Sequence, residues 1–278
     1  MRIYDVLAKA LLLVLKLQQA AESAGKEEEV ALWRYVREHQ FFILRTGQVY
    51  RFEDYRRSLD PARTSFVSTA FGAHGDAVSQ QAMALLVRTL EEITDPEQQQ
   101  LMLVIIDLLN FIADTAQHEE FDEHLKSFYV DPPLVIARFD TREEAEAWLK
   151  ELAEPPSEAY ILIDDKYYAV WYSREEGTRN LWRDHVMEQW IEAFTEKELP
   201  AAVASFNTRE EAEQWLKSHP MPPMSFVTIA GEHHLVAYHK RLTHHTLHPL
   251  SSLKEWEAEK KRRGEEPEAA DEVSASEE

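Results

Sequence analysis

Six of the twelve histidines lie between His233 and His248, and a run this dense is where a metal site would first be sought. A zinc site needs two or more imidazoles that converge at about 2 Å on one point. His233 and His239 fall on the same side of an expected strand, but six strand residues separate them by about 20 Å. His244 and His248 would share a helix face, yet Pro249 follows at once. We therefore predict no metal ligands and expect surface or edge-strand histidines.

The segment from His118 to His124 places two histidines around four acidic residues, which resembles part of a zinc helix. Such a helix carries its two imidazoles four residues apart, on one face. Here the position four after His118 is Asp122, and His124 comes six residues later. The spacing predicts a polar helix face.

A glycine-containing segment, residues 71–76, holds His74 and Asp76, with Ser65 and Ser68 nearby. A serine nucleophile requires hydroxyl, imidazole and carboxylate to meet in space, which nearness in sequence does not supply. The sequence contains no G-x-S-x-G elbow, no phosphate-binding loop and no dinucleotide fingerprint, and only seven glycines. We predict a capped turn here and name no catalytic or cofactor-binding residue and no cofactor.

Adjacent carboxylates occur at Glu143-Glu144 and again at Glu210-Glu211. Both pairs are expected in the first turn of a helix, where the helix dipole favours negative charge, so helix formation accounts for most of their presence. Trp148 and Trp215 follow on the apolar stripes of the same two helices. This placement predicts core packing rather than stacking on a ligand.

The two helices belong to an internal repeat. Residues 137–150 read ARFDTREEAEAWLK and residues 204–217 read ASFNTREEAEQWLK, which match at 11 of 14 positions with an offset of 67. Chance does not account for this match, so we infer two copies of one structural unit. We expect the offset to continue without a gap, which aligns Pro155-Pro156 with Pro222-Pro223, Ile163 with Ala230, Trp171 with Tyr238, and Arg174 with Arg241.

Each copy has the pattern of a strand, a helix and two further strands. In the first copy Thr141 and Glu144 have the spacing of a capping box, in which hydroxyl and carboxylate each accept from a backbone amide of the helix start. A Pro-Pro pair then ends the helix, and two apolar segments flank Asp164-Asp165 as a hairpin. The order is β-α-β-β, twice, and we expect the two copies to pack as a pseudo-twofold pair.

The whole chain is predicted to be an α+β protein with an α-rich N-terminal domain, two tandem βαββ repeats and an acidic disordered tail. The predicted boundaries are 1–130 for the α-rich domain with a small hairpin near 41–53, 131–250 for the repeats (134–174 and 201–241, joined by a helix at 178–196), 251–263 for a helical extension, and 264–278 for the tail.

The composition excludes several classes of function. With 51 acidic and 30 basic residues the chain has a formal charge of −21, which opposes non-specific nucleic-acid binding. It has no cysteine, which excludes disulfides, cysteine-based zinc or iron–sulfur sites and a thiol nucleophile. The apolar run at residues 10–15 is too short to cross a bilayer or to form a signal-peptide core. We expect a cytoplasmic protein without a membrane span.

Three classes of function stay open on the sequence. The first is a non-catalytic acidic protein that binds a basic protein surface, such as an inhibitor or an immunity- or antitoxin-like protein. Its expected contacts are Glu143, Glu210 and the acidic turn Asp164-Asp165. The second is a structural or assembly component that forms homo-oligomers through the repeats, and the third is an enzyme or small-ligand sensor with an unrecognised site. Acidity, duplication and the missing catalytic signature favour the first.

Overall fold

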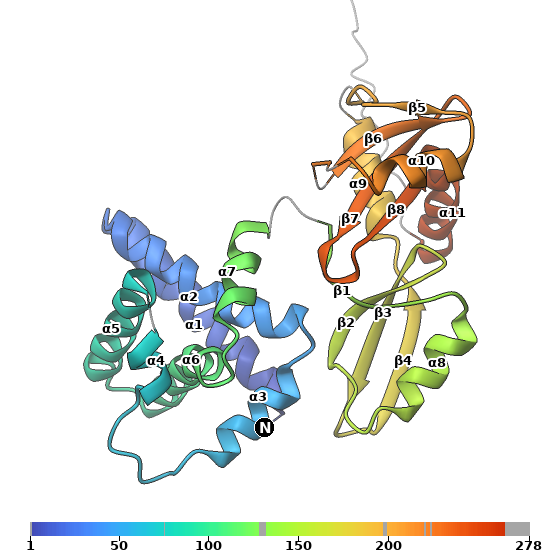
Figure 1. Ribbon diagram of the computed structural model, residues 1–278. Coiled ribbons are helices and arrows are strands. Elements are labelled where there is room, and N and C mark those ends of the chain that lie inside the picture. Colours follow the sequence, from blue (N-terminus) through green and yellow to red (C-terminus); the bar gives the residue numbers. More distant parts are fainter. Residues whose placement is uncertain are drawn as a thin grey trace, which may run out of the picture. The chain divides into compact units, whose positions relative to one another are not determined.

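The computed structural model describes residues 2–74, 76–127, 132–196, 199–219, 221–222 and 224–264 (Figure 1). Its first part is helical, as predicted. The helices are α1 (Ile3–Ser23), α2 (Glu27–Arg45), α3 (Val49–Ser58), α4 (Thr69–His74), α5 (Ala77–Glu92), α6 (Pro96–Asp114) and α7 (His118–Ser127). Two four-stranded sheets follow, so the fold is α+β.

Helix α6 forms the centre of the helical core. It begins at a signal that the sequence carries: the Asp95 carboxylate accepts from the backbone N–H of Glu97 at 3.1 Å, and Pro96 takes the first helical position. From Leu101 to Ala113 nearly every residue is buried. The helix packs against α1, α2, α4 and α5, so apolar burial on several sides holds the helical region together.

The hairpin predicted near residues 41–53 is wrong, because this stretch forms the end of α2 and the start of α3. The Thr46-Gly47 pair ends a helix instead of turning a hairpin. Gly47 has φ +67°, and the N–H of Gln48 donates to the carbonyl of Ile43 at 2.8 Å, which is the usual geometry of a helix end with a left-handed glycine. Phe42, Tyr50 and Phe52 of this stretch pack into the helical core.

The first repeat forms sheet A, with strand order β1-β2-β3-β4. Its elements are β1 (Val135–Phe139), α8 (Arg142–Glu151), β2 (Glu158–Ile163), β3 (Lys166–Ser173) and β4 (Thr178–Arg183). Strand β1 runs parallel to β2, and β2 runs antiparallel to β3. The predicted capping box is present at Thr141 and Glu144, and Ala145 and Leu149 of α8 pack on one face of the sheet.

The second repeat forms sheet B, with strand order β5-β6-β7-β8. Its elements are β5 (Ser205–Phe206), α10 (Arg209–Leu216), β6 (Met224–Ile229), β7 (Glu232–His239) and β8 (His244–Pro249). Strand β5 is parallel to β6, and the two later pairs are antiparallel. The hydroxyl of Thr208 accepts from the N–H of Glu211 at 3.2 Å, so α10 starts as α8 does.

The helix predicted at residues 178–196 is wrong in its first half. Residues Thr178–Arg183 form β4, and the helix that follows, α9, covers only Val186–Thr195. Strand β8 is the counterpart of β4, so each repeat is β-α-β-β-β and extends beyond the predicted ends at 174 and 241. Most of β4 is exposed, and Leu181 is its residue that packs against the core of sheet A. A strand this polar lacks the alternation that sequence patterns detect.

The gap-free offset of 67 is also wrong after the helix. Arg142 and Arg209 begin the two helices 67 residues apart. The two hairpins, however, close with the pairs Ile163–Lys166 and Ile229–Glu232, which are 66 apart. The second copy is therefore one residue shorter between helix and hairpin. The structure aligns Ile163 with Ile229, Trp171 with Ala237, Tyr172 with Tyr238, and Arg174 with Lys240.

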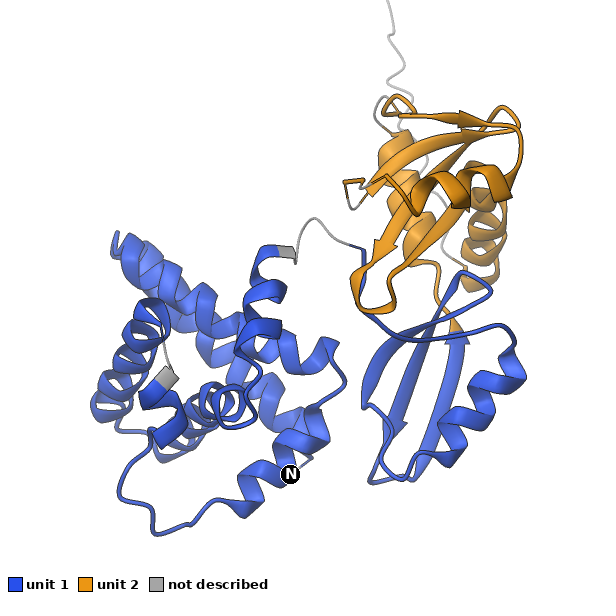
Figure 2. Ribbon diagram, viewed as in Figure 1, with its two compact units in different colours: residues 1–182 blue, residues 183–278 orange. Residues whose placement is uncertain are grey.

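The chain divides into two compact units, residues 1–182 and 183–278 (Figure 2). This differs from the predicted boundary near residue 131, because the first repeat belongs to the same unit as the helices. The pseudo-twofold pairing of the repeats stays a prediction. Of the predicted tail, residues 265–278 lie outside the described residues.

In the second unit, α9 and α11 (Leu253–Arg263) pack on sheet B. The indole N–H of Trp256 donates to the Glu192 carboxylate at 2.8 Å, which joins the two helices. The ring of Phe194 meets that of Phe226 edge-on at 5.5 Å between centroids. Successive side chains of a strand point to opposite faces of the sheet. Val227, the residue after Phe226 on β6, packs on the side of α10, so Phe226 and the helices α9 and α11 lie on the other face.

Candidate functional site

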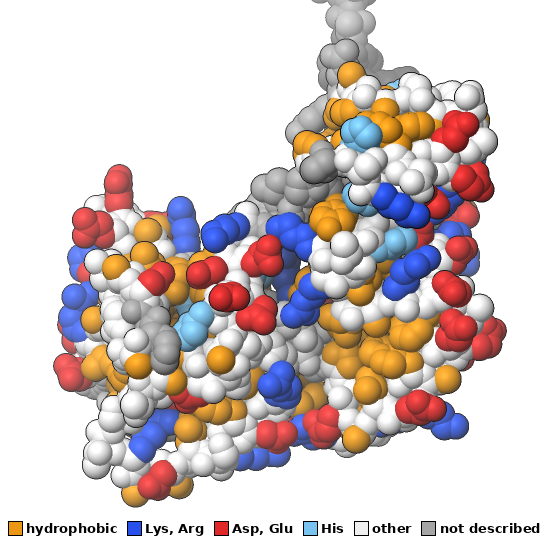
Figure 3. Space-filling model, viewed as in Figure 1, with side chains coloured by type: hydrophobic (Ala, Val, Ile, Leu, Met, Phe, Trp, Pro, Cys, Tyr) orange, Lys and Arg blue, Asp and Glu red, His pale blue; other side chains and the backbone are white. Residues whose placement is uncertain are grey.

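Each repeat carries an aromatic pair beside the start of its helix. In the first copy the rings of Phe139 and Trp148 are 5.2 Å apart between centroids. In the second copy Phe206 and Trp215 are 5.5 Å apart. All four residues are half-buried, so the tryptophans pack against the core yet keep part of their surface in solvent. Figure 3 shows hydrophobic side chains gathered over this part of each repeat, with acidic side chains beside them.

An open groove runs along the second aromatic pair. It is lined by Phe206, Glu210, Glu211, Gln214, Trp215 and Ser218. The imidazole of His219 stacks on the indole of Trp215 at 4.2 Å with an interplanar angle of 10°, so one face of the tryptophan is supported. The groove therefore joins a fixed aromatic surface to carboxylates at the helix start.

Apart from the aromatic pair and the alanine at the start of the match, the residues that the two copies share fall into two groups. The first group builds the helix: the capping threonine and glutamate, and the buried alanine and leucine. The second group is charged and faces outward. It comprises Arg142, Glu143, Glu146 and Lys150 in the first copy, and Arg209, Glu210, Glu213 and Lys217 in the second. Exposed positions accept many residue types at little cost in stability, so folding does not require this second group to be the same in both copies.

Part of the charged group is already paired within its helix. Arg142 lies 2.7 Å from Glu146, and Arg209 lies 2.8 Å from Glu213, each as an i,i+4 ion pair. The hydrogen bond to Glu146 raises the pKa of Arg142. Surface pairs of this kind contribute roughly 0.3–0.5 kcal/mol, so they support the helices only weakly.

Glu143 and Glu210, two residues predicted as partner contacts, are exposed at the second position of α8 and α10. Glu210 lines the groove. Hydrogen bonds from its own backbone N–H and from the Thr208 hydroxyl lower the pKa of Glu210, which therefore carries a negative charge at neutral pH. The structure thus places Glu210 next to the second aromatic pair, and Glu143 occupies the equivalent position of α8.

The predicted turn Asp164-Asp165 contributes one exposed carboxylate rather than two. Both residues have positive φ, 48° and 58°, as a two-residue hairpin turn requires. Asp164 is exposed, and its N–H donates to the carbonyl of Phe139 at 3.2 Å, so the turn lies beside the first aromatic pair. Asp165 is 9% exposed, with its carboxylate 3.8 Å from the Arg138 guanidinium, and we do not retain it as a contact.

We call these residues the aromatic–acidic surfaces: Phe139, Glu143, Trp148 and Asp164 in the first copy, and Phe206, Glu210 and Trp215 in the second. An exposed aromatic ring next to carboxylates suits a lysine or arginine side chain, because the ring attracts the cation and the carboxylate pairs with it. Such contacts bind without chemical change. The Ser218 hydroxyl of the groove lies 3.1 Å from Nδ1 of His219, but Nδ1 also lies 2.9 Å from the carbonyl of Trp215. A carbonyl only accepts, so Nδ1 carries the proton and is not a base for this hydroxyl.

The histidines between His233 and His248 do not form a metal site within the described residues. His239 and His248 are buried, and their Nε2 atoms lie 3.0 and 2.8 Å from the hydroxyl of Thr246. A threonine hydroxyl has one proton, so it donates to one ring and accepts from the other. His248 lies on β8, an edge strand, as the expectation of surface or edge-strand histidines allows. The expectation is wrong for His239, which is buried on the inner strand β7.

The other sequence candidates also serve the fold. His124 lies on α7 with its Nε2 atom 3.4 Å from a carboxylate oxygen of Glu38. Asp76 caps α5 by accepting from the N–H of Ser79 at 2.7 Å, as the predicted capped turn requires. The hydroxyl of Ser68 accepts from the N–H of Phe71 at 3.1 Å, within the start of α4.

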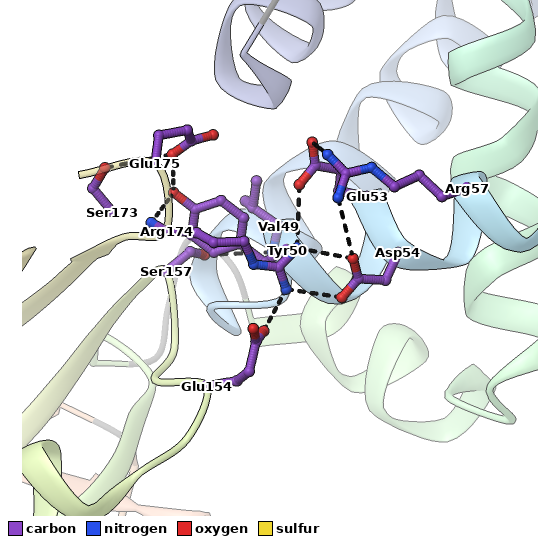
Figure 4. A network of polar contacts seen from close by, with 10 residues as sticks. All are labelled: Val49, Tyr50, Glu53, Asp54, Arg57, Glu154, Ser157, Ser173, Arg174 and Glu175. Atoms are coloured by element: carbon purple, nitrogen blue, oxygen red, sulfur yellow. Dashed lines mark hydrogen bonds and ion pairs between the residues drawn. The ribbon is translucent and has the colours of Figure 1, made fainter. Parts of the chain in front are cut away.

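A polar cluster around Arg174 joins the first repeat to the helical region (Figure 4). Both terminal nitrogens of Arg174 donate to the two oxygens of Asp54 at 2.8 Å, and the guanidinium also contacts Glu53 and Glu154. It lies 4.7 Å above the ring of Tyr50. The hydrogen bond from Arg174 lowers the pKa of Asp54. Arg57 also lies 2.7 Å from Glu53 and 3.7 Å from Asp54, so two arginines share these acids. Because its groups pair with one another across the two segments, we assign the cluster to the attachment of the repeat.

The tyrosine of this cluster is tied to the sheet by two further bonds. The Tyr50 hydroxyl accepts from the backbone N–H of Arg174 at 2.9 Å and donates to Glu175 at 2.8 Å. Burial, with the nearby Glu175 carboxylate, raises the pKa of Tyr50 to about 12. Sequence reasoning missed this cluster, because its members are about 120 residues apart and no local pattern links them.

No family model, curated protein or solved structure matches this chain. Among the described residues, no single helix combines the length and apolar composition needed to cross a membrane; α6 and α7 meet those criteria only as a pair bent by 112°.

Proposed function

We propose that this protein is a non-catalytic binding protein whose two aromatic–acidic surfaces engage a partner protein with a basic surface. An inhibitor, or an immunity- or antitoxin-like protein, fits this description. The formal charge of −21 supports it, because an acidic surface attracts a basic partner and repels nucleic acid. A cytoplasmic location, which suits a chain without cysteine, is part of the same proposal.

The proposal rests on one observation: the same exposed charged residues stand beside the aromatic pair in both copies, and their ion pairs support the helices only weakly. They surround half-buried Phe–Trp pairs whose geometry is also repeated. Aromatic residues with a polar rim are typical of the parts of interfaces that contribute most to binding. A cation on an exposed aromatic ring contributes roughly 0.5–1 kcal/mol. Each surface alone is therefore weak, and tight binding requires both surfaces on one partner.

A capture experiment with the full-length chain tests this proposal. Extract from the native cells is passed over the immobilised protein, and the bound material is eluted with a salt gradient. We expect a heterologous protein with an excess of lysine and arginine to elute as the salt rises, because the charges involved are exposed. Capture of this chain alone, with a defined oligomer mass by light scattering, would contradict the proposal and favour assembly through the repeats.

A further inference from the structure

The helical region contains a cavity of about 70 Å³ that the aromatic–acidic surfaces do not use. A single water occupies roughly 10–15 Å³ of such a volume, so the cavity has room for several waters or for a small ligand. Its polar lining comprises Tyr35 and His39 of α2, Asp76 and Ser79 at the start of α5, and His118 and Asp122 of α7. Apolar side chains, Phe121 among them, complete the wall.

His39 supplies an acceptor atom, Nε2, that solvent reaches although most of the residue is buried. Its ring is 3% exposed, and Nδ1 lies 3.0 Å from the carbonyl of Tyr35 on the preceding turn of α2. A carbonyl only accepts, so Nδ1 carries the proton and Nε2 presents a lone pair on the opposite side of the ring. Burial lowers the pKa of His39 to about 3, which keeps this tautomer neutral. Within the described part of the chain, Nε2 makes no hydrogen bond.

The other polar groups of the cavity also favour a donor-rich, positively charged ligand. Asp76 and Asp122 place two carboxylates at the lining, and the described lining residues include no lysine or arginine. One oxygen of Asp76 caps α5, which leaves the other for a ligand. Burial, then the two nearby carboxylates, raise the pKa of Tyr35, so its hydroxyl stays protonated. The ring of Phe121 lies 4.1 Å from that of His39 and supplies an apolar wall.

We propose that this cavity binds a small primary alkylammonium compound. The ammonium group donates to Nε2 of His39 and lies in the field of Asp76 and Asp122, and the short alkyl part rests against Phe121. Water in the cavity can also donate to Nε2, so the hydrogen bond alone does not favour the ligand. The ammonium group displaces that water and adds its attraction to the two carboxylates. The carboxylates select a cation over a neutral or anionic molecule of the same size.

A titration of the full-length protein with propylammonium chloride tests this site. The ¹⁵N resonance of His39 Nε2 reports directly on a hydrogen bond to that atom. We expect a saturable shift with a dissociation constant in the millimolar range, as suits a ligand of four non-hydrogen atoms, and a matching rise in melting temperature. Sodium propionate and sodium chloride at equal ionic strength should leave the resonance unshifted.

Two variants separate the site from a general salt effect. Asp122→Asn removes an exposed carboxylate at the lining without disturbing the core, and should weaken propylammonium binding at least about threefold. Glu119→Gln removes an equal charge from an exposed position of α7 outside the lining, and should leave binding within about 1.5-fold. The proposal is overturned by the absence of a saturable shift, by an equal response to sodium chloride, or by equal effects of the two variants.

Discussion

The two repeats have the same fold but different neighbours. The first repeat is attached to the helical region through Arg174, which pairs with acids of α3 and rests on Tyr50. The second repeat has Lys240 at the position of Arg174, and Ala237 at that of Trp171. It packs against α9 and α11 instead. The hairpins have thus diverged to fit different surroundings, since a lysine cannot form the two-pronged pair that Arg174 makes.

The helix starts of the two repeats, in contrast to the hairpins, have kept the same residues. Here the copies match at 11 of 14 positions, and the match includes exposed charges as well as the buried residues. Different neighbours explain why the hairpins differ, whereas the proposed shared task would explain why exposed residues stay the same. The contacts of Arg174 place attachment at the hairpin end of the first repeat. Partner binding at the helix starts of both copies is what we propose.

Gly47→Ala should give the largest effect on the attachment of the first repeat. A Cβ at Gly47 would lie 2.5 Å from the Cβ of Pro156 and 2.9 Å from the carbonyl oxygen of Glu158, at a φ of +67°. We expect a loss of about 2–4 kcal/mol in the free energy of unfolding, measured by urea denaturation. Hydrogen exchange should rise most in residues 43–58 and 155–160.

Gly25→Ala is the matched control for that substitution. Gly25 also follows a helix with positive φ, +69°, but nothing lies within 4 Å of its Cβ position. Its loss should be only about 1 kcal/mol, from backbone strain alone. Equal losses for the two variants would show that the approach of Pro156 to Gly47 does not hold the repeat in place.

Arg174→Ala should have the next largest effect, because it removes the cation that three carboxylates share. Arg57, 2.7 Å from Glu53 and 3.7 Å from Asp54, still pairs with two of them, whereas Glu154 loses the pair with Arg174. We expect a loss of about 1–3 kcal/mol in the free energy of unfolding near pH 7, since two of the acids are half-exposed. Lys240→Ala at the equivalent exposed position should change it by less than about 0.5 kcal/mol. Similar losses in both variants would contradict the difference between the repeats.

The difference in the free energy of unfolding between the native protein and Arg174→Ala should depend on pH. Arg174 lowers the pKa of Asp54, so the stabilisation is present above the ordinary carboxylate pKa of about 4 and is lost as the pH falls through the lowered value. The difference in stability between the native protein and Arg174→Ala should therefore shrink on acidification below pH 4. A difference that stays constant from neutral pH to about pH 2 would argue against the ion pair.

Ala230→Asn tests the hairpin turns, with a smaller effect. Ala230 has φ 51° and precedes Gly231, in the turn that Asp164-Asp165 forms in the first copy. Asparagine tolerates this backbone region better than alanine, so the variant should gain about 0.5–1 kcal/mol in thermal denaturation. Asp164→Asn in the first copy should change little, since aspartate is already tolerated. A gain at Asp164 and none at Ala230 would reverse the expected order.

The parts of the fold that were predicted correctly depend on patterns of residues that lie close together in the sequence. The Asp95-Pro96 start of α6, the Thr141–Glu144 capping box and the duplicated helices all depend on residues close in sequence. Predictions failed where a local signal had two meanings: Thr46-Gly47 suits a hairpin turn and a helix end alike. They failed also where there was no signal, as in the polar strand β4. The second copy is one residue shorter in the loop between helix and hairpin. A loop has no hydrophobic periodicity from which this difference could be predicted.

The candidate site could be predicted only in part. The repeat singled out Glu143 and Glu210, and both are exposed; their role in partner contact stays a prediction. The half-burial of Trp148 and Trp215 could not be read from an apolar stripe, which indicates which side of a helix packs but not how completely. The burial of Asp165 and the cavity around His39 depend on contacts between distant segments, and the sequence carries no local trace of them.

The most direct test of the central claim is the affinity of the captured partner for charge-reversed variants, measured by calorimetry. Glu143→Lys and Glu210→Lys should each weaken binding about fivefold, and the double variant at least about tenfold, because each surface contributes an exposed charge contact. The control is Glu27→Lys with Glu28→Lys, an equal change of charge in the exposed first turn of α2, which should stay within about twofold. A double variant that binds as tightly as this control would contradict the account.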